Sequence, residues 1–143
     1  MNVPKIPNNS LTEEITELVS LCEQLFPDYG EETMWFSPPE SKSEIMKWET
    51  EHGVTLPPSF KEWLEFAGDT QILNGTARFY GTKMFGYHSQ YLPDDYIDIG
   101  ELIGDGQYLC FSKSTGKLIK YDHGKSREFK DFKYVLNHIL DLI

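Results

Sequence analysis

The spacing of the apolar residues changes near Gly68, and this change limits the fold more than any other feature of the sequence. Before Gly68, apolar residues recur every three or four positions, which is the period of one helix face. From there to about residue 129 they fall in short strand-like runs separated by turn residues, and the last dozen positions return to the helical period. Helices, consecutive hairpins and a closing helix together predict an α+β domain, in which helices flank a twisted antiparallel sheet.

Four helices are expected, and their ends carry recognisable signals. Ser10 with Glu13, and Ser41 with Glu44, have the spacing of a capping box. Pro27 is expected to end the first helix, and a pair of prolines opens the third. The four expected helices span about residues 10–27, 41–53, 57–68 and 131–142.

Strand-like runs predict a sheet of five to six strands. The segments 105–106, 114–116 and 122–124 have the composition of turns, so we expect hairpins between consecutive strands. The candidate strands are residues 71–73, 76–80, 96–101, 107–111, 117–121 and 127–129. Residues 1–9 contain two prolines and little that could be buried, so we expect a flexible N-terminal tail before a single domain of residues 10–143.

The chain of 143 residues carries 23 acidic and 13 basic residues, a formal net charge of −10. This charge opposes binding to nucleic acid and to anionic lipid, because both select basic proteins. The sequence has no signal-peptide pattern and no apolar run long enough to cross a membrane, so we expect a cytoplasmic protein. Residues 1–51 are strongly acidic whereas residues 113–133 are basic, and this asymmetry either steers a charged partner or serves solubility alone.

No motif for catalysis, metal binding or cofactor binding stands out. The four histidines lack the spacing of a zinc site, and the glycine-containing segments lack that of a phosphate loop. Cys22 and Cys110 lie within apolar patterns, as reduced core thiols do. His88 lies in an aromatic loop with Tyr87 and Tyr91, where a functional role is an open alternative. We therefore expect no catalytic residue, no metal and no cofactor.

Acidic residues are the most distinctive chemical feature, and five of them lie between residues 94 and 105. Three interpretations are open: a carboxylate site for acid–base or cation chemistry, a sheet edge defended by charge, and a surface for a basic protein partner. Strand alternation places Asp98 on one face, and Ile99 with Glu101 on the other. For the partner surface, the candidate residues are Asp94, Asp95, Tyr96, Asp98 and Glu101.

A second acidic and aromatic segment follows the first helix. Here Glu31 and Glu32 precede Met34, Trp35 and Phe36, outside any periodic element. Either the three apolar side chains fill the core, or they form an exposed patch that marks a partner site. We take Glu31, Glu32 and Trp35 as a second set of candidate partner-binding residues.

Two groups of motifs point to a known family. The first runs Ser43-Glu44-Ile45, Trp48-Glu49, His52-Gly53-Val54 and Leu56-Pro57-Pro58-Ser59-Phe60-Lys61-Glu62-Trp63-Leu64. The second comprises Tyr96–Gly100, Gly106-x-Tyr108-Leu109-Cys110-Phe111, Thr115-Gly116-Lys117, Tyr121-Asp122-His123 and Phe129-x-x-Phe132. Together these motifs, over about residues 41–140, resemble the SUKH superfamily.

This resemblance implies an α+β domain with a non-enzymatic role. In bacteria it implies an immunity protein that binds and blocks a polymorphic toxin delivered between neighbouring cells, whereas fungal relatives regulate cell-wall synthesis as interaction hubs. Our leading hypothesis is therefore an immunity protein whose acidic surface binds a basic cognate toxin, such as a nuclease. The alternative is a non-catalytic regulatory protein-interaction domain, and a small hydrolase or metal enzyme is a third class.

Overall fold

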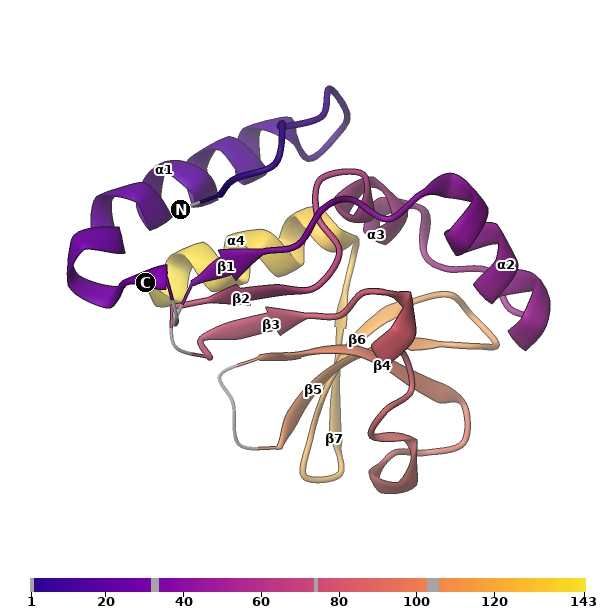
Figure 1. Cartoon of the computed structure of the whole chain (residues 1–143). Coiled ribbons are helices and arrows are strands. Elements are labelled where there is room, and N and C mark those ends of the chain that lie inside the picture. Colours follow the sequence, from indigo (N-terminus) through magenta and orange to yellow (C-terminus); the bar gives the residue numbers. More distant parts are fainter. Residues whose placement is uncertain (1, 32–33, 74, 103–105) are drawn as a thin grey trace.

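The computed structural model describes residues 2–31, 34–73, 75–102 and 106–143. Over these residues, four α-helices gather on one side of a seven-stranded antiparallel sheet, which confirms the predicted α+β class (Figure 1). The helices are α1 (Thr12–Tyr29), α2 (Lys42–His52), α3 (Pro58–Leu64) and α4 (Phe132–Leu142). The strands are β1 (Trp35–Phe36), β2 (Thr70–Ile72), β3 (Ala77–Phe79), β4 (Tyr96–Leu102), β5 (Gln107–Ser112), β6 (Leu118–Asp122) and β7 (Lys125–Phe129).

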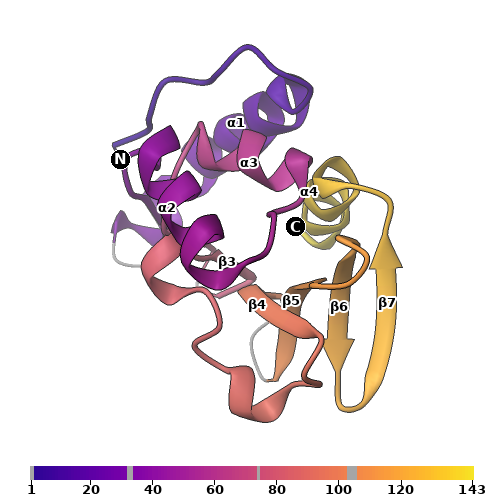
Figure 2. The ribbon, with the colours of Figure 1, turned by 90° about the vertical axis from the view of Figure 1, so that its right-hand side faces the viewer.

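The sheet is a meander, in which each strand pairs with the next in the sequence from β1 to β7. Figure 2 shows its twist, with β6 and β7 turned away from β3. Strand β1 adds one strand to the predicted number, because two residues are too few to show alternation. The predicted turn at 122–124 is confirmed, since His123 and Gly124 both take positive φ, 48° and 87°. The predicted turn at 105–106 includes Asp105, which lies outside the described residues.

Helix α1 differs from its prediction at both ends. Its first residue is Thr12 with Leu11 at the N-cap, so the capping box of Ser10 and Glu13 does not form. The hydroxyl of Ser10 instead contacts the Glu62 carboxylate near α3. Pro27 lies inside the last turn of the helix and does not end it as predicted. Two more helical residues follow Pro27 before the chain turns at Gly30.

Helices α2 and α3 begin as predicted. The Ser41 hydroxyl accepts a hydrogen bond from the Glu44 backbone N–H (3.1 Å), and Gly53 ends α2 in the left-handed conformation. Pro58 opens α3, which ends at Leu64, four residues earlier than predicted. The chain turns there because the N–H groups of Phe66 and Ala67 both bond to the carbonyl of Trp63.

The apolar stripes of the helices meet the covered face of the sheet in an aromatic core. Trp63 of α3 lies 5.0 Å from Phe79 of β3 between ring centroids, and Phe132 of α4 lies 5.1 Å from Phe79 and 5.3 Å from Phe60. Edge-to-face packing of this kind fixes how α3 and α4 sit on the sheet.

Both cysteines are buried and free, as predicted for reduced core thiols. Burial, and secondarily the charge of Glu23, raises the pKa of the Cys22 thiol to about 11. Burial also raises the pKa of the Cys110 thiol, so both groups stay protonated and poorly nucleophilic at neutral pH.

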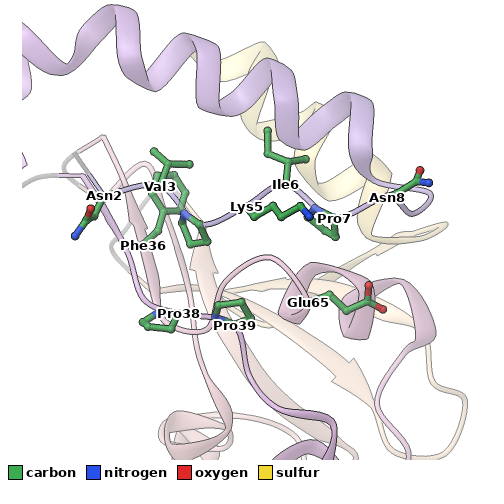
Figure 3. Close-up of a pocket in the computed structure, with 11 residues that line it drawn as sticks. Asn2, Val3, Lys5, Ile6, Pro7, Asn8, Phe36, Pro38, Pro39 and Glu65 are labelled. Carbon is green, nitrogen blue, oxygen red and sulfur yellow. The ribbon is translucent and has the colours of Figure 1, made fainter.

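Residues 2–9 run between α1 and the Pro38-Pro39 segment (Figure 3). Val3 and Ile6 pack against the core, and the Thr12 hydroxyl donates a hydrogen bond to the carbonyl of Pro7 (2.8 Å). These contacts hold the segment in place in this structure, whereas its flexibility in solution stays a prediction.

A candidate partner-binding face of the sheet

A β-bulge in β4 decides which side chains reach the face of the sheet that the helices leave uncovered. Asp98 and Gly100 pair with consecutive residues of β5, so Ile99 is the extra residue of the bulge. The extra residue shifts the alternation by one position, and Asp98 and Glu101 therefore lie on the same face. The prediction that Ile99 and Glu101 share a face is wrong, because regular alternation does not allow for a bulge.

One row of side chains crosses this uncovered face through all seven strands. Register pairs link each member to the next: Trp35, Gln71, Arg78, Glu101, Tyr108, Tyr121 and Ser126. All seven are at least partly exposed, whereas strand neighbours such as Phe36, Phe79 and Leu109 belong to the core. We call these seven residues the cross-sheet row. The row therefore crosses the full width of the sheet.

The connection between β3 and β4 packs on this face beside the row, and a buried carboxylate holds it there. Asp98 is fully buried and accepts hydrogen bonds from the backbone N–H of His88 (3.1 Å) and from its Nδ1 (3.0 Å). The His88 ring lies 4.9 Å from that of Tyr108 between centroids. The anchored connection carries Tyr87 and Tyr91, which are exposed by 67% and 62%.

The charge of Glu101 helps to keep the hydroxyls of Tyr80 and Tyr108 protonated. Burial raises the pKa of the Tyr80 hydroxyl, and the charge of Glu101 and a hydrogen bond to it raise this pKa further. Burial also raises the pKa of Tyr108, followed by the charges of Glu101, Tyr91 and Asp98. The Tyr80 hydroxyl also lies 3.2 Å from Nδ1 of His88.

Basic residues of the β6–β7 hairpin lie on the opposite side. Lys120 pairs in register with the core residue Leu109 and with Arg127. Arg127 lies over the Phe129 ring, 5.3 Å from the centroid, and this ring packs against His138 of α4 at 5.7 Å between centroids. Burial lowers the pKa of His138, and the charges of Lys120 and Arg127 lower it further. Two cations of the basic segment at 113–133 therefore lie on the helical side of the β6–β7 hairpin and not on the uncovered face.

The first set of predicted partner-binding residues divides into exposed and internally bonded members. Asp94 is exposed just before β4. Asp95 accepts hydrogen bonds from the Ser114 backbone N–H (3.0 Å) and hydroxyl (2.9 Å). The hydrogen bond from the Ser112 hydroxyl, followed by those from Ser114, lowers the pKa of Asp95. The Asp95 carboxylate thereby holds the turn between β5 and β6 in place.

The other members of this set lie in β4. Tyr96 is half-buried, bonds through its hydroxyl to Ser126 (3.0 Å) and packs against Tyr121. Glu101 is partly exposed in the cross-sheet row. Asp98, in contrast, is fully buried and cannot touch a partner from this position. Its carboxylate holds His88, and that is the role the structure gives it.

The second set of predicted partner-binding residues, Glu31, Glu32 and Trp35, belongs to the segment between α1 and β1 and to β1 itself. Met34 and Phe36 are buried, which agrees with the core interpretation, whereas Trp35 is partly exposed at one end of the cross-sheet row. Glu31 is exposed, and Glu32 lies outside the described residues. Trp35 and Glu101, predicted as parts of two separate surfaces, therefore share one face.

Sequence reasoning missed Tyr80, Arg78, Tyr108 and Tyr121 as members of this face. The pattern Tyr108-Leu109-Cys110 contains alternation that could indicate an outward Tyr108, but nothing local shows that Glu101 is its neighbour. That neighbourhood depends on the bulge and on the register between β4 and β5.

Among the described residues, no group of three histidine, cysteine or acidic side chains could hold a metal ion, and no helix could span a membrane. A cavity of about 740 Å³ beneath residues 2–8 is lined by Phe36, Pro38 and Pro39, with Lys5 and Glu65 as the charged residues among the described lining (Figure 3). This cavity offers mainly apolar contacts.

Comparison with known proteins places the chain in a family. Residues 39–141 match the sequence model of the SMI1 / KNR4 family (SUKH-1). The chain belongs to this family. It is also 27% identical over 149 residues to the SPbeta prophage-derived uncharacterized protein YokK of Bacillus subtilis (strain 168), an alignment that covers 97% of this chain and 76% of YokK. The matched SUKH-1 region includes β2 to β7 and hence most of the cross-sheet row, while Trp35 precedes it.

Proposed function

We propose that this SUKH-1 protein is an immunity protein that neutralises a contact-delivered toxin by stoichiometric binding, without catalysing a reaction. The observation that carries the proposal is the cross-sheet row, a preformed face that combines aromatic side chains with the Glu101 carboxylate. Aromatic residues in a rigid, partly desolvated surface are typical anchors of protein interfaces. Membership of the SMI1 / KNR4 family supports a protein-binding role.

The charge of the chain supports a basic partner. A net charge of −10 accelerates the approach of a cationic protein, and it penalises polyanionic ligands. Toxins that cleave nucleic acid have basic clefts, which an acidic surface can occupy. The prophage origin of YokK fits a role in conflict between cells or genomes. Candidate contacts on the described surface are Asp94, Tyr96, Glu101, Glu31 and Trp35, and the predicted contacts of Asp95 and Glu32 stay with this proposal.

Co-expression with the toxin-like product of a neighbouring gene tests the proposal. We expect the two proteins to co-purify in a fixed ratio and the chain to restore growth of cells that produce the toxin. A toxin that kills equally well with and without the chain would contradict the proposal. A pull-down that instead recovers a non-toxic endogenous partner would favour the regulatory alternative.

A further inference from the structure

We propose that Glu101 and the aromatic rings around it form a binding site for one arginine side chain of a protein partner. The inference deepens the proposed function and rests on it for the identity of the partner. It concerns the centre of the cross-sheet row, where Glu101 lies between Arg78 of β3 and Tyr108 of β5.

Among the residues that the structure describes, no ion pair within 4.0 Å includes the Glu101 carboxylate. Its cross-strand neighbour Arg78 places its guanidinium over the Tyr80 ring, 5.5 Å from the centroid. A partly buried carboxylate that lacks an ion pair gains most from a cation that arrives with the partner.

Aromatic rings surround the carboxylate. Tyr108 is the cross-strand neighbour of Glu101, and His88 packs between Tyr108 (4.9 Å between centroids) and Tyr80 (6.1 Å). Tyr91 follows in the same connection, where its backbone N–H bonds to the carbonyl of His88 (2.9 Å). Tyr91 is 62% exposed, so this side of the cluster is open to solvent. Ring faces next to a carboxylate attract a cation through their quadrupoles as well as through the full charge.

The rings are held in place before a ligand arrives. The fully buried Asp98 accepts two hydrogen bonds from His88, and the Gly86 backbone N–H bonds to the Asp98 carbonyl (3.0 Å). These bonds fix the connection that carries Tyr91. Binding therefore costs less ordering of side chains than it would on a mobile loop.

The chemistry of the cluster favours arginine over lysine. A guanidinium is planar, so it can stack on a tyrosine ring and direct N–H groups to a carboxylate at the same time. An ammonium is more strongly hydrated and makes no such stacked contact. Each carboxylate oxygen has two lone pairs, so Glu101 can accept from two N–H groups of one guanidinium at the same time.

A titration of the purified chain with N-acetylarginine amide, followed by NMR of the tyrosine rings, tests the site without any toxin. We expect saturable shifts of Tyr91 and Tyr108 at millimolar probe, and at least tenfold weaker binding to the Glu101→Gln variant. The matched control is Glu128→Gln, because Glu128 lies on the same face in β7 but pairs with Lys117 (3.4 Å). This control is expected to bind like the wild type.

Several results would overturn the assignment. They are the absence of saturable shifts, equal binding to Glu101→Gln, and equal binding of the neutral citrulline analogue. Equal binding of N-acetyllysine amide would overturn the preference for arginine. The toxin complex separates this inference from the proposed function: a complex that survives Glu101→Gln undiminished removes the arginine site alone, whereas arginine binding without any toxin complex removes the immunity role alone.

Discussion

Removal of the Asp98 carboxylate should release the connection between β3 and β4 and destabilise the whole domain. In the Asp98→Ala variant, the partly buried backbone N–H of His88 loses its acceptor, and Nδ1 of His88 keeps only the Tyr80 hydroxyl at 3.2 Å. An unsatisfied buried donor costs about 1–3 kcal/mol. Because the connection can turn toward water, we expect a total loss of about 2–4 kcal/mol rather than the full sum.

This loss is large against the stability of a typical domain, about 5–15 kcal/mol. A protein of this size has a urea m-value of about 2 kcal/mol/M, so the urea midpoint should fall by about 1–2 M. The assay is equilibrium urea unfolding followed by tryptophan fluorescence. Since Trp63 is fully buried in the core, its emission reports global unfolding.

Asp94→Ala is the matched control, because it removes the same charged group four residues earlier from an exposed position. Surface changes of this kind cost within about 0.5 kcal/mol. If the two variants unfold at the same urea concentration, the assignment of Asp98 as the anchor of His88 is wrong.

Three further predictions concern backbone space and pH. Gly100→Ala should lower the free energy of unfolding by about 2 kcal/mol or more, because an added methyl clashes with the backbone carbonyl of Arg78. Gly81→Ala should cost less, because the clash there is with the end of the Glu40 side chain and the backbone nitrogen of Asp69 lies at ordinary contact distance; equal losses would contradict this. The pKa of Asp95 is lower in the folded chain, so its carboxylate contributes folding stability above about pH 4 and loses that contribution in stronger acid. The difference in urea midpoint between wild type and Asp95→Asn should therefore narrow at about pH 3. A difference that stays constant with pH would refute this linkage. The pKa of His138 is also lower in the folded chain, so the unfolded chain binds the proton more readily and the folding stability falls as the pH drops through about 6.5. Between about pH 8 and pH 5.5, His138→Gln should therefore lose less folding stability than the wild type. An equal loss in the two proteins would contradict this prediction.

The order of elements could be predicted from the sequence because each depends on local chemistry. The cap of Ser41, the left-handed Gly53 and the proline start of α3 act within one turn of the chain, and all three agree with prediction. The failed cap at Ser10 has a distant cause, since its hydroxyl contacts Glu62 instead. Long-range partners of this kind are not encoded in local spacing.

The candidate site could be predicted only in part. The acidic and aromatic composition of the segment at 94–101 pointed to β4, but which of its side chains face outward depends on the bulge at Ile99. The burial of Asp98 depends on a connection whose irregular backbone gives no periodic signal. The approach of Trp35 to the same face depends on β1, a pairing of two residues with β2.

Calorimetric titration of the purified, catalytically inactivated toxin domain into wild type and two tyrosine variants tests most directly whether the partner binds the uncovered face. Tyr91→Ala changes a 62% exposed side chain beside the cross-sheet row, and Tyr134→Ala changes a 48% exposed side chain on α4, at the helical side. We predict a dissociation constant at least tenfold higher for Tyr91→Ala and an unchanged one for Tyr134→Ala. The reverse pattern would place the partner on the helices and contradict the account.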